Sequence, residues 1–212
     1  NIRDAVNGYP GNKDVYGDIS KWDVSRVTNM AGLFANNKEF DGDISRWDVS
    51  SVKNMSEMFA GSTFNGDISC WDVKNVKDMS RMFKKSEFNG DISEWDVSSV
   101  EYMVGMFSDS EFNGDISCWN VSNVYYMSYM FKESQFNGDI SNWDVSNVEN
   151  MNYMFYNNKI FWKDISCWDV SKVTKMRSIK NMFEDSLLQE EYKPNTDKNC
   201  STPKQRSRTY EL

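Results

Sequence analysis

Aspartates recur along this chain at a fixed spacing, and paired carboxylates are groups that can bind a hard cation or hydrolyse a glycoside. In the segment FNGDISCWDV, residues 64–73, Asp67 and Asp72 lie five positions apart. Similar segments recur, so that the acidic or amide residues fall into two columns. The first column is Asp18, Asp43, Asp67, Asp91, Asp115, Asp139 and Asp164, and the second is Asp23, Asp48, Asp72, Asp96, Asn120, Asp144 and Asp169.

Two interpretations of these columns stay open. If the repeats stack, like charges would lie ~4.8 Å apart and repel by about 1 kcal/mol per neighbour in water. A row of Ca²⁺ sites would offset this repulsion, because hard cations take several carboxylate and carbonyl oxygens. The favoured alternative is that each Asp accepts backbone N–H groups in a turn, with a nearby Ser doing the same. Asn120 favours the turn, since an amide replaces an anionic ligand poorly.

Composition disfavours catalysis and several partner classes. The 212 residues include no histidine, so a Ser-His-Asp or Cys-His site cannot form within the chain. Seven equal copies argue against a glycosidase, because an enzyme singles out one site. The net charge of −8 disfavours nucleic acid and anionic membranes as partners. No apolar run approaches the ~20 residues that span a bilayer, and no signal peptide is evident. We expect neither enzymatic activity nor a cofactor.

The residues that must position these groups form an internal repeat. Tryptophans stand at 22, 47, 71, 95, 119, 143 and 168, a spacing of 24 residues with 25 at either end. We call the copies rungs one to seven. Their shared pattern is F-N-G-D-I-S-x-W-D-V-S-x-V-x-x-M-x-x-M-F-x-x-S. A period of this length predicts one supersecondary unit per repeat, stacked as a solenoid.

The spacing inside a rung predicts two elements. The W-D-V alternation suits a short strand, with Trp and Val facing the core. Val76, Met79, Met82 and Phe83 share one face of a helical turn, and F-N-G-D has turn chemistry. We therefore predict an α/β fold, a leucine-rich-repeat-type solenoid of seven 24-residue rungs, each with a short parallel strand and a short helix. The predicted domains are an N-terminal cap (1–16), the repeat solenoid (17–186) and a polar tail (187–212).

The repeat resembles known families. The spacing I-x-x-W-x-V-x-x-V is similar to the L-x-x-L-x-L segment of leucine-rich repeats, and M-x-x-M-F-x-x-S resembles the helical half of BspA-like repeats. The full pattern resembles a surface-lipoprotein repeat of unknown function found in bacteria, algae, protists and large viruses. The resemblance covers residues 17–186. It implies a surface or interaction role by analogy and no catalytic residues.

The last rung departs from the pattern. IFWKDIS (160–166) replaces FNGDIS, and KMRSIKNMF (175–183) inserts three residues between the two Met positions. This insertion predicts a longer helix that caps the stack. The polar tail predicts a mobile segment or an arm bound to a partner.

Tryptophan, methionine and cysteine also recur in columns. The tryptophans and methionines are predicted as core, in preference to a glycan-stacking row or a metal site. Cys70, Cys118 and Cys167 occupy alternate rungs, ~10 Å apart, beyond the roughly 7 Å limit for a disulfide. Cys200 is expected to reach one of them, most plausibly Cys167. Their column faces outward, as a recognition face or an unconstrained surface: Lys21, Arg46, Cys70, Glu94, Cys118, Asn142 and Cys167.

Tyrosines cluster in rungs four to six. Because they share columns, we expect a contiguous patch on the helical side, and Tyr is favoured at interfaces. The predicted partner-binding residues are Tyr102, Tyr125, Tyr126, Tyr129, Tyr153 and Tyr156.

These observations predict a non-catalytic binding or adhesion module that acts through protein–protein contacts at a cell surface or outside the cell. The alternative is an architectural subunit of a large assembly, such as a virion shell or an extracellular filament, with the polar tail as a clamp. The expected partners are other proteins, without nucleic acid and without membrane insertion.

Overall fold

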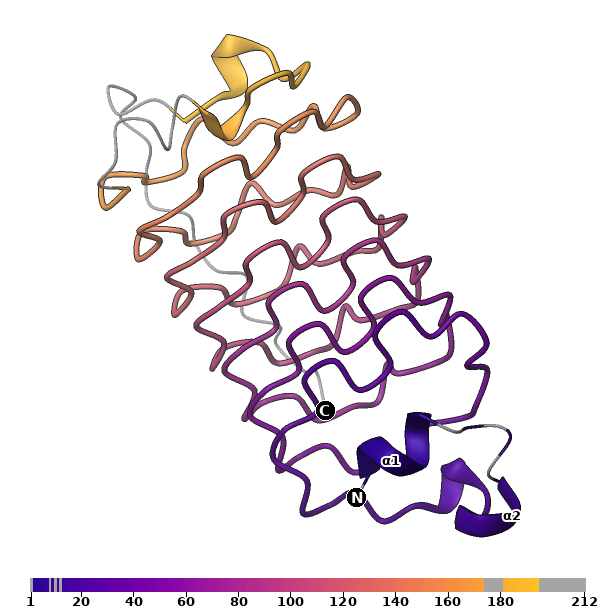
Figure 1. Ribbon diagram of the computed structural model, residues 1–212. Coiled ribbons are helices and arrows are strands. Elements are labelled where there is room, and N and C mark those ends of the chain that lie inside the picture. Colours follow the sequence, from indigo (N-terminus) through magenta and orange to yellow (C-terminus); the bar gives the residue numbers. More distant parts are fainter. Residues whose placement is uncertain (1, 8, 10, 12, 174–180, 195–212) are drawn as a thin grey trace, which may run out of the picture.

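In the computed structural model the chain winds through similar coils that stack along one axis (Figure 1). The structure describes residues 2–7, 9, 11, 13–173 and 181–194. Helices α1 (Ile2–Asn7) and α2 (Lys13–Tyr16) lie at the end of the stack where the chain begins, and the 3-10 helix η1 (Ile19–Lys21) follows them. A second 3-10 helix, η2 (Glu190–Tyr192), lies at the opposite end.

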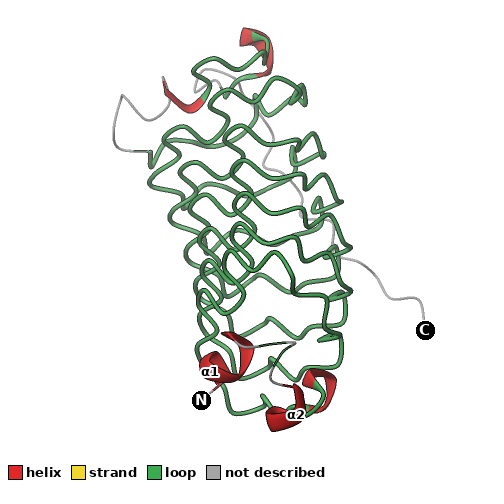
Figure 2. Cartoon of the chain, turned by 45° about the vertical axis from the view of Figure 1, so that its right-hand side comes forward, coloured by secondary structure: helices red, strands yellow, loops and turns green. Residues whose placement is uncertain are grey.

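The predicted α/β class is wrong, because the coils lack both elements expected of them. From rung two to rung six the chain forms turns and loops, and only isolated parallel bridges join neighbouring coils (Figure 2). In the described part of the chain, no such bridge involves the W-D-V segment, which the sequence predicts as the strand. The bridges lie instead just before the first Met of each rung, linking Asn54 to Asn29 on one side and to Asp78 on the other.

The segment predicted as a helix is a run of overlapping turns. In rung two the Met58 N–H donates to the Met55 carbonyl at 3.2 Å. The third residue of that turn, Glu57, has φ of 58°, and Gly61, four residues later, has φ of 66°. A type II turn requires this left-handed conformation at its third position. Positive φ recurs in the same two columns at Gly32, Asn36, Arg81, Lys85, Gly105, Asp109, Tyr129, Glu133, Tyr153 and Asn157.

Contacts between rungs explain why this strip of turns replaces the helix. The Glu57 N–H donates to the Ser80 carbonyl at 2.8 Å, and the Phe59 N–H donates to the Met82 carbonyl at 2.9 Å. A helix would use such groups internally and would need about 8–10 Å between neighbouring axes. The rings of Phe59 and Phe83 are 5.8 Å apart, so one helix per rung does not fit. The M-x-x-M-F spacing suits turns repeated every four residues equally well.

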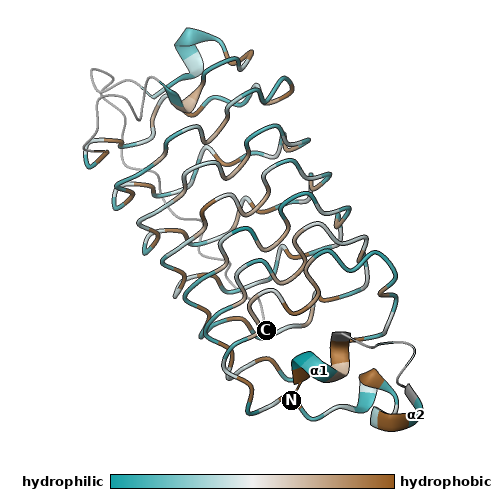
Figure 3. Cartoon of the chain, viewed as in Figure 1, coloured by the Kyte–Doolittle hydropathy of each residue, from teal (hydrophilic) through white to brown (hydrophobic). Residues whose placement is uncertain are grey.

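Hydrophobic positions recur along the stacked coils (Figure 3), and apolar side chains of all seven rungs form one continuous core, as predicted. Phe83 and Phe107 stack with ring centroids 5.7 Å apart, and Trp71 and Trp95 stack at 6.5 Å. From rung two onward the core tryptophans are 1–4% exposed, which confirms them as core. Their indole N–H groups bond to the preceding rung, as when Trp95 donates to the Ile68 carbonyl at 3.1 Å.

The two 25-residue spacings are absorbed by asparagine in a column that otherwise carries serine. Asn158 is fully buried. Its Oδ1 accepts the N–H groups of Ile160 and Phe161 at 3.0 and 2.9 Å, and its Nδ2 lies 3.4 Å from the Phe136 carbonyl. Asn37 accepts the N–H two residues later at 3.1 Å in the other long spacing. A longer side chain thus bridges the bulge made by one extra residue.

The two ends of the stack differ from its middle. At the first end, Val6 of α1 is buried in the core, as a cap would be. The helix predicted at 175–183 lies largely outside the described residues, as does most of the polar tail. The domain boundaries therefore stay predictions.

Candidate functional site

The aspartates of both columns act as hydrogen-bond acceptors in turns. Asp67 Oδ1 accepts the backbone N–H of Ser69 at 2.9 Å and its hydroxyl at 2.7 Å. All fourteen members of the two columns, Asn120 included, accept the backbone N–H two residues later. These bonds confirm the turn interpretation. Asn120 shows that an amide fills the same role as a carboxylate.

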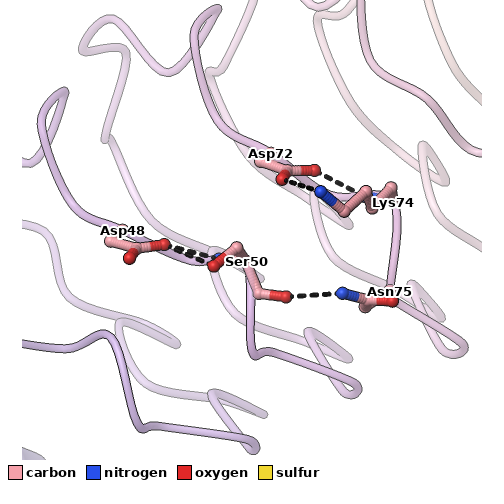
Figure 4. A network of polar contacts seen from close by, with 5 residues as sticks. All are labelled: Asp48, Ser50, Asp72, Lys74 and Asn75. Atoms are coloured by element: carbon pink, nitrogen blue, oxygen red, sulfur yellow. Dashed lines mark hydrogen bonds and ion pairs between the residues drawn. The ribbon is translucent and has the colours of Figure 1, made fainter.

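Figure 4 shows two neighbouring turns of the second column. Asp48 accepts both groups of Ser50, at 3.1 and 2.6 Å. In the next rung Lys74 replaces that serine, and its Nζ forms a 2.8 Å ion pair with Asp72. Asn75 Nδ2 then donates to the Ser50 carbonyl at 2.8 Å. Side chains therefore close each turn and also join one turn to the next.

For several of the aspartates these bonds favour the ionised form in spite of the stacking of like charges. The N–H and the hydroxyl of Ser69 hold the pKa of Asp67 below its usual value, against the opposing effects of desolvation and the like charge of Asp43. Among the described residues, no group of three or more acidic or cysteine side chains is arranged to hold a metal ion. The calcium interpretation gains no support from this part of the chain.

The cysteine column faces outward, as predicted. Cys70 and Cys118 are exposed free thiols. Cys167 takes part in a disulfide bond. Cys200, its predicted partner, lies outside the described residues. All seven side chains of this column are exposed: Lys21, Arg46, Cys70, Glu94, Cys118, Asn142 and Cys167.

Five of the six predicted partner-binding tyrosines meet in two groups on the strip of turns. The rings of Tyr102 and Tyr126 stack with centroids 5.4 Å apart and planes 5° apart. Tyr129 and Tyr153 stack at 5.4 Å, and Tyr156 meets Tyr153 edge-on at 5.6 Å. Each stack joins adjacent rungs, so the tyrosines form ordered ladders on the surface.

This set of six residues, which we call the tyrosine surface, remains accessible. Tyr102, Tyr125 and Tyr129 are 40%, 39% and 40% exposed. Among the described residues Tyr125 makes no ring contact, but it stands next to Tyr126 in the chain. The Nζ of Lys132 lies 5.5 Å from the ring centroid of Tyr156. The surface therefore presents aromatic area beside a cationic group.

Tyrosine is not the residue that the local turn favours in the column of Tyr102 and Tyr126. In four other rungs this position carries Asn or Asp, whose oxygen accepts the N–H two residues later, as Asn54 does from Ser56 at 2.8 Å. A phenol cannot make that short-range bond, and loss of a comparable cap costs about 0.5–2 kcal/mol. Two adjacent rungs thus lack a local stabilising contact.

The column of Tyr129 and Tyr153 also disfavours tyrosine. These residues have φ of 62° and 57°, a left-handed conformation that costs roughly 1–2 kcal/mol for a residue with a side chain. Gly105 occupies the same column one rung earlier, at φ of 60°. Ring stacking offsets only part of this cost, since an aromatic pair contributes about 0.5–1.5 kcal/mol.

Sequence reasoning missed a ladder of asparagines along the F-N-G-D turns. Asn65 Oδ1 accepts the N–H of Asn89 at 2.9 Å, and the pattern continues through Asn113 and Asn137 at 2.8 Å each. The repeated Asn in consecutive stacked rungs was the available signal, because such ladders recur in stacked chains. From the sequence, these asparagines are predicted only to form turns.

A groove of about 730 Å³ opens beside this ladder, between rungs five and six. Its lining includes three carboxylates, Asp115, Asp139 and Asp144, together with Cys118 and Asn142 of the outward column. We call it the acidic groove. The sequence could not show it, because it lies between residues that are 24 positions apart.

Stacked turn-built rungs with an aromatic core define this molecule as a repeat protein, as predicted. It belongs to the family described as "Mycoplasma protein of unknown function, DUF285", whose model matches residues 4–111 and again residues 85–193. No curated protein matches the chain, and no solved structure matches it. Within the described ranges, no helix has the length and apolar character needed to cross a membrane.

Proposed function

We propose that this protein is a non-catalytic binding module that docks another protein on the tyrosine surface. The observation that supports it is the position of the tyrosines. Four of them occupy columns where the turns favour Asn, Asp or Gly, and five of them form ordered ring contacts on the surface. Residues that weaken their own turns are better explained by an external contact than by folding.

A protein partner fits this surface better than other classes. Tyrosine buries a large area at low entropic cost and is enriched at the centres of protein interfaces. Charges of both signs lie beside it, as in the ion pair at 3.1 Å between Lys77 and Glu101, the chain neighbour of Tyr102. Such exposed pairs contribute little to stability and suit the polar rim of an interface. The net charge of −8 disfavours nucleic acid.

We place this module at a cell surface or outside the cell. The disulfide of Cys167 supports this location, because disulfides persist in oxidising environments. The resemblance of the repeat to surface-lipoprotein and BspA-like sequences supports it as well.

An architectural subunit, in a virion shell or an extracellular filament, is the second candidate. Large apolar side chains are exposed at both ends of the stack. Val15 and Tyr16 are 74% and 46% exposed near the first rung, and Leu187 and Trp162 are 68% and 59% exposed near the last. Contacts between such ends would build open linear assemblies.

The deciding experiment compares two matched double variants. A photoreactive phenylalanine analogue at Tyr125 first captures and identifies the partner in the native source. Tyr126→Ser with Tyr129→Ser should then weaken the affinity of the purified partner by roughly tenfold or more. Asp78→Ser with Arg81→Ser changes the same two columns two rungs earlier and should leave it unchanged. Equal affinity of both variants, with folding intact, would refute the proposal.

A further inference from the structure

We propose that the protein docked on the tyrosine surface carries a short acidic segment, which extends past the tyrosines onto three lysines of rungs two and three. We call these residues, Lys53, Lys84 and Lys85, the lysine patch. This inference rests on the proposed function, because it names the chemistry of the partner that the tyrosine surface would dock. The charge of the patch, its place in the stack and the charges around the tyrosines support it.

The lysine patch consists of cations that the protein itself leaves uncompensated. Two of its lysines are exposed and one, Lys84, is half-buried. Lys77 and Arg81, the other basic residues of this part of the strip, each form an ion pair with a glutamate, at 3.1 and 3.0 Å. Among the described residues, the patch lysines form no ion pair with an acidic side chain. A carboxylate of a partner can therefore pair with them without first breaking an ion pair inside the protein.

Backbone hydrogen bonds connect Lys53 to the tyrosine surface along one column. The Lys77 N–H donates to the Lys53 carbonyl at 2.8 Å, and the Glu101 N–H donates to the Lys77 carbonyl at 2.9 Å. The Tyr125 N–H then donates to the Glu101 carbonyl at 3.0 Å. Lys53 therefore lies in line with Tyr125, three rungs before it.

A second column connects the other two lysines to Tyr156. The Lys85 N–H donates to the Ser108 carbonyl of rung four at 2.9 Å. The same contact repeats between rungs four and five at 2.7 Å, and between rungs five and six at 2.9 Å, where the acceptor is the Tyr156 carbonyl. Lys84 and Lys85 thus lie in a column that leads to Tyr156. The lysine patch and the tyrosine surface are parts of one continuous strip of turns.

The net charge of this strip reverses between its two parts. Segments 53–61 and 77–85, in rungs two and three, hold five basic and two acidic residues, a net charge of +3. The equivalent segments with the tyrosines, 101–109, 125–133 and 149–157, hold one basic residue and four acidic ones, a net charge of −3. Complementary charges fix the register of a complex and suppress wrong partners. We therefore expect negative charge only on the part of the partner that faces rungs two and three.

An acidic protein segment fits this reversal better than a nucleic acid does. Aromatic side chains beside basic ones also occur where proteins bind single-stranded nucleic acid. A strand that reached both parts of the strip would place phosphates over the four acidic residues beside the tyrosines. The net charge of −8 of the whole chain opposes such a polyanion as well. A short run of Asp or Glu, by contrast, confines its charge to the lysine patch.

Fluorescein-labelled hexaglutamate tests the patch without the partner. Fluorescence anisotropy at low salt should show that the wild type binds this peptide about fivefold more tightly than the variant Lys84→Gln with Lys85→Gln does. The matched control, Lys21→Gln with Arg46→Gln, removes the same charge from exposed positions of the outward column and should bind as the wild type does. The difference between the variants should vanish at about 1 M salt, where the Debye length is about 3 Å.

The partner captured at Tyr125 supplies the second measurement. Carbodiimide treatment of its complex with the full chain should join Lys84 or Lys85 to a carboxylate of the partner, as the carbodiimide takes up the water that amide formation releases. Lys84→Gln with Lys85→Gln should weaken the affinity of the partner about fivefold. Asp78→Ser with Arg81→Ser leaves the net charge of the strip unchanged, which agrees with the unchanged affinity expected for that variant.

The other outcomes separate this inference from the proposed function. Hexaglutamate binding that is equal in the wild type and the lysine variant, or equally reduced in the lysine variant and its control, refutes the lysine patch as an anion site. Full partner affinity in Lys84→Gln/Lys85→Gln, with weaker binding in Tyr126→Ser/Tyr129→Ser, refutes the acidic segment and leaves the proposed function intact. Unchanged affinity in the tyrosine variant refutes the proposed function itself. Capture of a nucleic acid at Tyr125 overturns the acidic protein segment.

Discussion

One side-chain oxygen recurs as a hydrogen-bond acceptor in the turns around each tryptophan. There an Asp or Asn accepts the N–H two residues later, as Asp67 does from Ser69. The carboxylates are therefore held by hydrogen bonds in columns that would otherwise repel. At several of these positions the bonds favour the ionised carboxylate, from which we expect the stability of the fold to depend on pH.

Acidification should destabilise the protein mainly below about pH 4, the ordinary range of the Asp pKa. Hydrogen bonds from the neighbouring serines lower the folded-state pKa of several column members. A group with a depressed folded pKa stabilises the fold above its unfolded pKa, and this contribution is lost as the pH falls through the folded pKa. Urea unfolding measured from pH 6 to pH 3 checks this. The groups with lowered pKa are Asp23, Asp43, Asp48, Asp67, Asp91 and Asp169.

A triple variant supplies the control. Asp43→Asn, Asp67→Asn and Asp91→Asn keep the acceptor oxygens and remove three titrating groups, so the acid-induced loss of unfolding free energy should become smaller. An identical pH dependence in the variant and the wild type would show that these carboxyls are not responsible.

The turn strip is the element that distinguishes this fold from the one expected. Its alternate N–H groups bond within the rung and to the next rung, as those of Met58 and Glu57 do. Sequence spacing placed Met and Phe on the correct inner face. It could not choose between a helix and turns, because both bring residues at i, i+3 and i+4 to one side. Hydrogen bonds to the neighbouring rung favour the turns over a helix.

Asn158 should be the polar residue of this strip that is most sensitive to substitution. Asn158→Ala would leave the buried backbone groups of Phe161 and Phe136 and the partly buried N–H of Ile160 without their partner, and each unsatisfied buried group costs about 1–3 kcal/mol. We expect the free energy of unfolding to fall by about 3 kcal/mol, measured by urea denaturation. Asn37→Ala, which loses one exposed bond, should cost about 1 kcal/mol. Equal effects of both would contradict the bridging role of Asn158.

At the scale of the whole molecule, the rungs are equivalent layers of one core. From rung two to rung six, each contributes a stacked phenylalanine, an indole hydrogen bond and turn contacts to its neighbours. The stability of such an array is approximately a sum of repeat and interface terms. We therefore propose to seek function where the rungs differ, as they do at the tyrosine surface.

Deletion of residues 89–112 should leave a folded protein of six rungs. Phe88 and Phe112 occupy the same column, so Phe88 joined to Asn113 continues the core in register. Since 24 of 212 residues are lost, the denaturant m-value should fall by about a tenth. Circular dichroism checks that the deletion variant is folded, and urea unfolding measures its m-value. Deletion of 101–112 breaks the register and should unfold the chain, and similar behaviour of the two deletions would refute rung equivalence.

The sequence by itself determined the period, the core columns and the outward cysteine column, and it favoured the turn role of the aspartates over calcium binding. These follow from local chemistry and from spacing, which a single chain displays directly. Only the tertiary structure decided that the strands and helices of an α/β fold are absent from the middle rungs. It also showed that an asparagine ladder links neighbouring rungs and that an acidic groove lies between rungs five and six. The reason is physical. Each of these features depends on partners about 24 residues away, and the close spacing of stacked coils selects turns whose N–H groups can reach the next coil.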